Sequence, residues 1–311
     1  MELYFLGTAA GLPTRQRNVS SVALNLMTER GTVWLFDIGE GTQHQMLKSP
    51  LKPGRLEFIF ITHLHGDHIF GLPGLLTSRS YQGGTQPLTI FGPVGIRKFV
   101  EVALSISQSH LDYELQVKEF HQGIVYEDQQ FRVTSSLLEH RIESYGFRIE
   151  EKIIPGTLDH ERLQKEGVIP GPIYARLKLG ETVRMPDGTV LDGKEYTFPP
   201  IPGRTIVISG DTRPCEQELT LAYRADVLVH EATYMHNRLD QAVQYFHSTA
   251  THAANLALQA EVGTLILTHI SSRYQDDQVG SLLEEARSIF PNSHVAEDFW
   301  SFPIPRKIER G

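Results

Sequence analysis

The sequence predicts an α/β fold in which two β-sheets pack against each other between layers of helices. Short apolar runs typical of strands alternate with helical stretches along the 311 residues. Most of these runs are continuously apolar and end in polar residues, as expected for strands covered on both faces. A chain of this length, with 40% hydrophobic and 21% charged residues, can bury a sizeable core. These observations favour two sheets between helices, with the chemistry carried by loops at one rim.

Nine apolar runs are the predicted strands. Their continuous apolar character favours strands that are buried in the interior of the fold. The polar residues that follow them are expected at the rim where α/β proteins place catalytic groups. In chain order the predicted strands are Leu3–Leu6, Ser21–Leu26, Val33–Phe36, Phe58–Thr62, Leu88–Phe91, Phe131–Thr134, Ile206–Ser209, Val227–His230 and Leu265–Thr268.

Four stretches are the predicted helices. In the last of them Leu282, Ala286 and Ile289 recur at the helical period, so one face is apolar. The third is expected to be capped by Ser248 or Thr249, whose hydroxyl can accept a backbone N–H. In chain order the predicted helices are Gly95–Gln108, Glu216–Arg224, Thr249–Glu261 and Gln278–Phe290.

The composition limits the classes of site that the chain can build. Cys215 is the only cysteine, so neither an intrachain disulfide nor a zinc–thiolate cluster can form, and a cytoplasmic location is expected. The sequence has no apolar run long enough to span a membrane, and Met1–Tyr4 lacks a secretory signal pattern. Any metal must therefore be bound by carboxylates and by some of the 14 histidines.

The net charge of −8 argues against a nucleic-acid substrate, because phosphate binding usually needs a basic surface. Its distribution weakens this objection. Acids are absent between Glu2 and Glu29, where Arg15 and Arg17 lie, and they are absent again over Ile69–Val100. Local basic faces on an acidic body therefore remain compatible with the sequence.

The strongest signal is the motif His63-Leu64-His65-Gly66-Asp67-His68, which follows the apolar run ending at Thr62. His63 and His65 are two residues apart, so in extended chain they point the same way and can hold one ion. Gly66 would permit a tight turn, after which Asp67 and His68 can face a second ion. Four potential ligands within six residues are hard to explain by structure alone, so we predict a metal site here.

Three further residues complete the predicted ligand set. His140 ends the segment that begins at Ser135, Asp211 follows the predicted strand ending at Ser209, and His269 follows the one ending at Thr268. Each taken alone is more often a structural residue than a ligand. Together with the His63–His68 motif, they are interpreted as ligands at the rim.

The order His-x-His-x-Asp-His, then His, Asp and His, resembles the pattern of the metallo-β-lactamase superfamily. The resemblance implies an αββα sandwich with two zinc ions roughly 3.5–4 Å apart, although these ligand types also suit manganese. Asp37 is interpreted either as an outer partner that orients a ligand histidine or as a capping residue. The implied partition is His63, His65 and His140 for one ion, Asp67, His68 and His269 for the other, and Asp211 as the bridge between them.

Local motifs narrow this superfamily, whose fold by itself does not select a substrate. Four blocks, Phe36–Gln43, His230–Thr233, His247–Thr249 and Leu267–Ser271, resemble the short form of ribonuclease Z. The resemblance extends from Met1 to about Pro305. It implies an endoribonuclease that hydrolyses the phosphodiester at the 3′ side of precursor tRNA and leaves a 3′-hydroxyl on the tRNA and a 5′-phosphate on the trailer.

The same resemblance implies three catalytic residues. Asp67 would accept the proton of the attacking water, and His247 with Glu231 would protonate the leaving 3′ oxygen. Two influences on His247 oppose each other: the nearby helix N-terminus lowers its pKa, and the carboxylate of Glu231 raises it.

Residues 150–200 are rich in Pro and Gly and interrupt the alternation of strands and helices. A long stretch of this kind is usually a functional excursion or a linker, and a solvated loop without a task is the alternative. Within it, Gly171–Gly180 is similar to the flexible arm with which ribonuclease Z proteins clasp tRNA. The implied organisation is a single metallo-β-lactamase domain over 1–311 with this tRNA-binding arm inserted, in a homodimer whose arms serve the partner's active site.

Two groups of residues are expected to contact RNA. The loop Pro13–Asn18 resembles a family loop near the cleavage site in which arginine here replaces a lysine, so that a planar fork replaces a point charge. The arm as a whole is not basic, with seven Lys and Arg against nine Asp and Glu between Glu150 and Pro200, so only its tip is expected to bind phosphate. The predicted RNA-binding residues are Arg15, Arg17, Asn18, Arg176, Lys178 and Arg184.

Two other functions use parts of the same pattern. A hydrolase of small molecules, such as a lactonase, thioesterase or sulfatase, would carry the same metals but has little reason to carry the arm or His247. A non-catalytic RNA-binding module would not need a complete ligand set. Metal content and a tRNA cleavage assay would separate the three functions.

Overall fold

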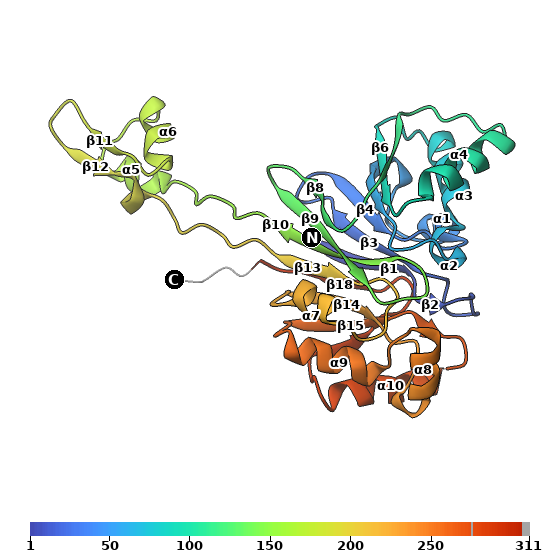
Figure 1. Cartoon of the computed structure of the whole chain (residues 1–311). Helices are drawn as coiled ribbons and strands as arrows, with labels where there is room; N and C mark the ends of the chain where they lie inside the picture. Colours follow the sequence, from blue (N-terminus) through green and yellow to red (C-terminus); the bar gives the residue numbers. More distant parts are fainter. Residues whose placement is uncertain (275, 307–311) are drawn as a thin grey trace. The chain divides into compact units, whose positions relative to one another are not determined.

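The computed structural model describes residues 1–274 and 276–306 and divides the chain into two compact units (Figure 1). The first unit comprises Met1–Glu150 and Thr205–Pro305, and the second is built on Glu151–Arg204. All nine predicted strands and all four predicted helices are present in the first unit, with ends shifted by four residues at most. Among the described residues, none of the helices has the length and apolarity needed to cross a membrane.

The first sheet of the first unit has the strand order β18-β1-β3-β4-β5-β6-β7. Strands β4 to β7 run parallel, whereas β18, β1, β3 and β4 are joined by antiparallel pairs. The strands are β1 Glu2–Gly7, β3 Ser21–Leu26, β4 Thr32–Phe36, β5 Leu56–Phe60, β6 Leu88–Gly92, β7 Leu115–Glu119 and β18 Ser301–Pro303.

The second sheet has the order β17-β15-β14-β13-β10-β9-β8. Strands β13, β14, β15 and β17 are parallel neighbours, and β10 pairs antiparallel with β13. Two-residue strands, β2 and β16, form a separate parallel pair. The strands are β2 Ala9–Ala10, β8 Gly123–Glu127, β9 Phe131–Leu138, β10 Ser144–Glu151, β13 Thr205–Ile208, β14 Val227–Glu231, β15 Thr264–Thr268, β16 Ile270–Ser271 and β17 Ser293–Val295.

Helices cover the outer face of each sheet, so the first unit has four layers (Figure 1). Buried aromatic side chains such as Trp34, Phe60 and Phe147 fill the space between the sheets. Two further apolar cores lie beneath the helices, and small side chains such as Ala253 and Ala257 bring α9 close to its sheet. The helices are α1 Thr42–Leu47, η1 Pro53–Arg55, α2 Gly66–Ile69, α3 Leu72–Tyr81, α4 Ile96–Ile106, α7 Glu216–Ala222, η3 His236–Arg238, α8 Leu239–Tyr245, α9 Ala250–Gln259 and α10 Asp276–Arg287.

The second unit is folded around its own small core. Leu163 and Leu177 are fully buried there, and the carboxylate of Asp159 caps α5 by accepting the N–H of Arg162 at 2.9 Å. Pro172 stands at the first position of α6, where its missing N–H costs nothing. The segment is therefore folded, and its task stays a prediction. Its elements are α5 His160–Lys165, α6 Pro172–Lys178, β11 Thr182–Arg184, β12 Val190–Asp192 and η2 Gly193–Tyr196.

The carboxyl ends of the parallel strands position the polar residues identified in the sequence. Asp211 follows β13, Glu231 ends β14, and His269 follows β15 directly. Because these three strands are parallel neighbours, their ends meet at one edge of the second sheet. In the first sheet, β5 ends just before His63.

Candidate metal centre

The seven residues predicted to bind metal come together at this rim. Their donor atoms form two groups, and within each group every donor lies within 4.8 Å of the others. The sequence motif at residues 63–68 contributes to both groups, as expected. The groups are His63, His65, His140 and Asp211, and Asp67, His68 and His269.

The first group has the dimensions of a metal site. His65 Nδ1 lies 3.1 Å from His63 Nε2 and 3.2 Å from His140 Nε2. Asp211 Oδ2 lies 3.6 Å from His63 Nε2. Ligands bound at about 2.0–2.1 Å around a tetrahedral zinc ion are roughly 3.3 Å apart, so these separations fit the ion.

The second group has similar dimensions and shares Asp211 with the first. Asp67 Oδ2 lies 3.5 Å from His68 Nε2 and 3.4 Å from His269 Nε2. Asp211 Oδ2 lies 3.5 Å and 3.3 Å from the same two nitrogens. A single carboxylate oxygen of Asp211 thus faces the donors of both groups, which is the position that a bridging ligand requires.

Hydrogen bonds to Asp37 set the protonation of two rings. His68 Nδ1 donates to Asp37 Oδ2 at 2.7 Å, and the Thr62 hydroxyl donates to the same oxygen at 2.8 Å. That hydroxyl therefore accepts from His63 Nδ1, 2.9 Å away. Both rings turn Nε2 toward the site, and His68 Nε2 is buried without a hydrogen-bond partner among the described residues. Such an orphaned nitrogen is what a metal ion would satisfy.

Two more ligand histidines are oriented in the same way. His140 Nδ1 donates to the backbone carbonyl of Phe246 at 2.9 Å. His269 Nδ1 lies 2.9 Å from the hydroxyl of Thr233, which itself donates to Glu231 Oε2 at 2.6 Å. The hydroxyl can therefore only accept from the ring, and each Nε2 is again left free to bind a metal.

The charges of the site suit a divalent cation. Burial lowers the pKa values of His63, His65 and His140, so these rings are neutral, as metal ligands must be. Burial alone would raise the pKa values of Asp67 and Asp211, but neighbouring histidines hold both below the ordinary range. Burial disfavours the charged form of His68, but the carboxylates of Asp211, Asp37 and Asp67 outweigh burial and raise its pKa well above the ordinary value. A bound cation would take the place of that proton. Imidazoles around two ionised carboxylates form a donor set that fits zinc.

Backbone conformation at the site is unusual in three places. Asp37, Phe246 and His269 have positive φ angles of 57°, 60° and 55°. Residues other than glycine adopt this conformation at a cost of roughly 1–3 kcal/mol, and they do so most often at functional sites. Here the strain places a carboxylate, a carbonyl and an imidazole against the metal centre.

Gly66 was expected to permit a tight turn, but the structure gives a different reason for a glycine at this position. It lies in the first turn of α2 and has no positive φ, so a turn that only glycine can adopt is not the reason for it. A Cβ atom at Gly66 would instead lie 2.2 Å from the ring of Phe70. The residue is small because Phe70 packs against its backbone.

His247 and Glu231 form the predicted pair. His247 Nδ1 lies 2.9 Å from Glu231 Oε1, and the backbone N–H groups of Thr212 and Ser248 also donate to this carboxylate. Burial lowers the pKa of His247, but the charge and hydrogen bond of Glu231 outweigh burial and raise the pKa to about 9. The N-terminus of α9 is capped by Thr249 and not by His247. Among the groups that raise the pKa of His247, Glu231 has the largest effect.

A cleft of about 370 Å³ opens beside this centre and contains residues that the sequence patterns did not indicate. Arg141 lies over the ring of Tyr245 at 5.1 Å, and Arg273 lies over the ring of Tyr234 at 5.2 Å. Only the nearness of Arg141 to His140 and of Arg273 to His269 could have indicated them. The cleft is lined by His65, His140, Arg141, Tyr234, Gln241, Tyr245, His247 and Arg273.

The predicted RNA-binding loop is only partly available. Arg15 is exposed, but Arg17 is 9% exposed, and its guanidinium donates to Thr8 Oγ1 and to the carbonyl of Ala296. The Asn18 amide donates to the carbonyl of Glu40. Arg17 is therefore largely buried and stabilises the loop, and its contact with RNA stays a prediction.

The three predicted RNA-binding residues of the second unit are exposed. Arg176 pairs with Glu181 at 2.8 Å, and both side chains are close to half exposed. Lys178 and Arg184 are also exposed. A surface ion pair contributes about 0–1 kcal/mol, so Arg176 can exchange its partner for a phosphate at little cost.

Comparisons with known proteins agree with this geometry. The chain is 57% identical over 307 residues to Ribonuclease Z of Anoxybacillus flavithermus, covering 99% of this chain and 98% of that protein. The crystal structure of human tRNase Z, short form, matches 98% of this chain and 100% of its own with a TM-score of 0.71 and 32% identity. Residues 1–166 also match the family model described as Anti-Pycsar protein Apyc1, so this half carries that family's pattern too.

A more distant structure supports the fold alone. The metallo-β-lactamase fold protein YhfI from Bacillus subtilis is 16% identical, with a TM-score of 0.67 over 97% of this chain and 98% of that chain. The αββα metallo-β-lactamase sandwich expected from the sequence is thereby confirmed.

Proposed function

The chain belongs to the ribonuclease Z family of tRNA 3′-processing endonucleases, and we propose that it cuts precursor tRNA with two zinc ions. The observation that supports this most directly is the convergence of imidazole nitrogens on one carboxylate oxygen of Asp211. Manganese is the alternative metal for such ligands. One ion would be held by His63, His65, His140 and Asp211, and the other by Asp67, His68, His269 and Asp211.

Asp67 is the proposed base. Ions bound at the two sites would polarise the scissile phosphodiester and make a water molecule acidic enough to attack near neutral pH. Asp67 is ionised, because its neighbouring histidines hold its pKa low, and the N–H of Gly11 orients its Oδ2 at 2.8 Å. It can therefore accept the proton that the attacking water releases.

His247 is the proposed acid. The ribose 3′ oxygen is a poor leaving group unless it receives a proton as its bond to phosphorus breaks. Glu231 keeps His247 protonated at neutral pH, since the pKa of the ring is raised to about 9. Proton transfer from His247 gives a tRNA with a 3′-hydroxyl and a trailer with a 5′-phosphate.

The cleft beside the metal centre is the proposed binding site for nucleotides around the cut. Arg141 and Arg273 would bind backbone phosphates, and Tyr234 and Tyr245 would stack on bases. Arg15 and Asn18 would contact the RNA from the loop that precedes β3. With these arginines gathered beside the cut, a chain with a net negative charge would still offer positive charge to the RNA backbone.

The second unit is the proposed tRNA-binding arm. Its exposed cations Arg176, Lys178 and Arg184 would contact the tRNA backbone at a distance from the cut. We further propose a cytoplasmic homodimer in which the arm of one subunit serves the active site of the other. An arm with its own core suits this role, because it can present its cations in a preformed arrangement.

A cleavage assay tests the function. Purified protein is incubated with a 3′-extended tRNA transcript, with and without a chelator, and the cut is mapped. We expect a single cut at the 3′ side of the tRNA, its loss on chelation, and its return with zinc. Cleavage that survives complete removal of metal would contradict the proposed chemistry, whereas hydrolysis of small esters alone would favour a small-molecule hydrolase.

A further inference from the structure

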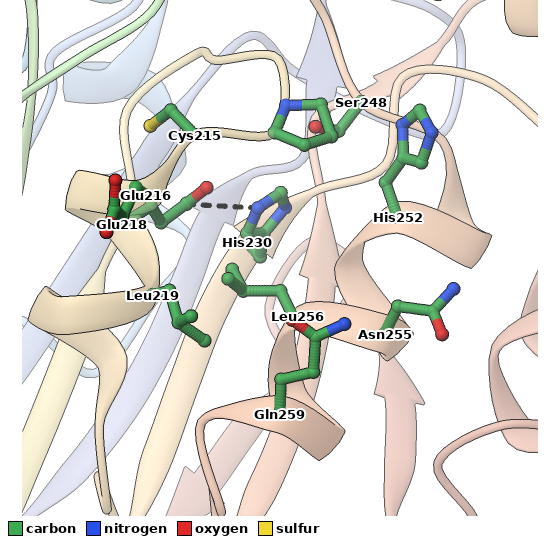
Figure 2. Close-up of a pocket in the computed structure, with 11 residues that line it drawn as sticks. Cys215, Glu216, Glu218, Leu219, His230, Ser248, His252, Asn255, Leu256 and Gln259 are labelled. Carbon is green, nitrogen blue, oxygen red and sulfur yellow. Dashed lines mark ion pairs between the residues drawn. The ribbon is translucent and has the colours of Figure 1, made fainter.

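A second cavity lies apart from the metal centre, between α7 and α9 (Figure 2). Its volume is about 340 Å³, at the small end of the range for ligand pockets. Leu219 of α7 and Leu256 of α9 form apolar walls, and Cys215 stands at the start of α7. None of the residues that line it belongs to the proposed metal ligands.

Two buried ionisable side chains line this cavity. Glu218 is 0% exposed and His230 is 1% exposed, and His230 Nε2 lies 3.0 Å from Glu218 Oε1 (Figure 2). The Ser209 hydroxyl donates to the same oxygen. The other carboxylate oxygen, Glu218 Oε2, is buried and has no hydrogen-bond partner in the described part of the chain. A buried carboxylate oxygen in this state is unfavourable, because the hydrogen bonds that it made to water are not replaced.

The charge of the cavity is negative. His230 donates from Nδ1 to the carbonyl of Glu231 and faces Glu218 with Nε2, so both ring nitrogens act as donors and the ring is a cation. It balances Glu218, and Glu216 adds a further negative charge to the lining. Burial lowers the pKa of His252, so that ring is neutral and does not offset Glu216.

We propose that this cavity is a binding site for a small organic amine, whose ammonium group is attracted by the negative lining of Glu216 and Glu218 and whose apolar body lies between Leu219 and Leu256. An anion would be repelled by the two carboxylates. Among the described residues, none of the groups of His, Cys, Asp and Glu side chains close enough together to hold a metal ion lies in this cavity. The volume admits a molecule on the order of ten heavy atoms.

Benzylamine is a suitable probe, with benzyl alcohol and benzoate as its neutral and anionic counterparts of the same size. Binding is measured by calorimetry and by protection of Cys215, the only thiol, from iodoacetamide. We expect benzylamine to bind and to slow alkylation at least about fivefold at saturation, since the ligand shares the cavity with the thiol. Benzyl alcohol should bind more weakly, and benzoate should not bind.

Two variants on one helix localise the site. Leu256→Trp fills the cavity, whereas Leu258→Trp places the same ring at a side chain that is 54% exposed. We expect Leu256→Trp to weaken benzylamine binding by about tenfold or more, Leu258→Trp to leave it unchanged, and both to retain tRNA cleavage. The proposal is overturned if the amine does not bind, if benzoate binds equally well, or if Leu256→Trp binds the amine as the wild type does.

Discussion

Two threonines show how single residues prepare this site for metal. Thr62 lies between His63 and Asp37, and Thr233 lies between His269 and Glu231. In each case the hydroxyl gives its proton to the carboxylate and can only accept from the imidazole. Asp37 thus selects the tautomer of His63 through Thr62, and Glu231 selects that of His269 through Thr233. Groups around metal sites commonly orient the ligands in this way.

The acid role of His247 can be tested by the choice of leaving group. His247→Ala should reduce cleavage of precursor tRNA by roughly 10²–10⁴-fold, because the 3′ oxygen leaves poorly without a proton. Hydrolysis of bis-p-nitrophenyl phosphate should fall far less, because p-nitrophenolate leaves unprotonated. The measurement is kcat on both substrates, with zinc content as the control for the metal centre. Equal losses on the two substrates would remove His247 from the proton transfer.

The buried pair of Glu218 and His230 predicts a pH dependence of stability. Burial lowers the pKa of His230, but Glu218 outweighs burial and raises it from 6.5 to about 9 in the folded protein. The contribution of the His230–Glu218 pair to the free energy of unfolding is therefore complete below pH 6.5, and it is lost as the pH rises toward 9. Urea denaturation should show a decline of at most about 3 kcal/mol across this interval.

Glu218→Gln is the matched variant for this test, because it removes the charge and keeps the size of the side chain. Its unfolding free energy should change less between pH 6.5 and 9 than that of the wild type. Parallel profiles of the two proteins would show that the pair does not set the dependence.

At the scale of elements, the ends of α8 and α9 carry much of the site. Helix α8 ends at Tyr245, and the left-handed conformation of the next residue, Phe246, directs its carbonyl to His140 Nδ1. Helix α9 begins one residue after Thr249, whose hydroxyl caps it, and His247 immediately precedes this cap region. The turn between the two helices thus orients the candidate ligand His140 through a carbonyl and contains the proposed acid, His247.

Substitutions of Phe246 test whether this helix end matters. Phe246→Val and Phe246→Asn both remove the ring, but only valine resists a positive φ. The valine variant should therefore misplace the carbonyl and weaken binding of the ion at His140 by about 10–100-fold. Competition with a chelator measures the affinity. Equal affinities of the two variants would show that the backbone conformation is unimportant.

Secondary structure was predicted well where the sequence signal is local. Strands β13, β14 and β15 were expected because each is a continuous apolar run followed by a polar residue. The helices α1, α2, α3 and α8 were not predicted. Of these, α1, α2 and α8 have only four to seven residues and depend on tertiary contacts for their stability. Helix α3 has Pro73 and Gly74 in its first turn, and both residues are signals against a helix. The edge strands β7 and β8 were also missed, because they are only partly buried and lack a continuous apolar run.

For the whole molecule, the distribution of charge matters more than its sum. The acid-free stretch Ile69–Val100 left a local basic face compatible with the sequence. Arg79 within it is fully buried, however, and donates to backbone carbonyls including those of Pro53 and Gln86. Arg97 and Lys98 of the same stretch are exposed, so only part of its positive charge faces solvent.

Removal of the second unit should separate RNA binding from chemistry. Deleting residues 155–195 should raise KM for precursor tRNA far more than KM for bis-p-nitrophenyl phosphate, because a small ester has no use for distant cations. Steady-state kinetics on the two substrates give the comparison. Equal changes in KM would contradict the assignment of this unit as a tRNA-binding arm.

Mixing two inactive proteins tests whether the arm acts across a homodimer. An Asp67→Ala chain retains the arm but lacks the proposed base, and the deleted chain retains the base but lacks the arm. If the arm of one subunit serves the other, subunit exchange should restore tRNA cleavage toward half of the wild-type activity of such dimers. Either protein alone is the control, and an inactive mixture with proven exchange would place arm and active site in the same subunit.

The sequence by itself determined nine of the strands and indicated the seven candidate ligands, because an apolar run and the polar residue after it are neighbours along the chain. It could not determine which nitrogen of each imidazole faces the metal, that Arg17 is buried, or that a cavity lies between α7 and α9. These features depend on partners from distant segments: the carbonyl that orients His140 lies 106 residues away. Only the packing of the two sheets and their helices brings such partners within hydrogen-bonding distance.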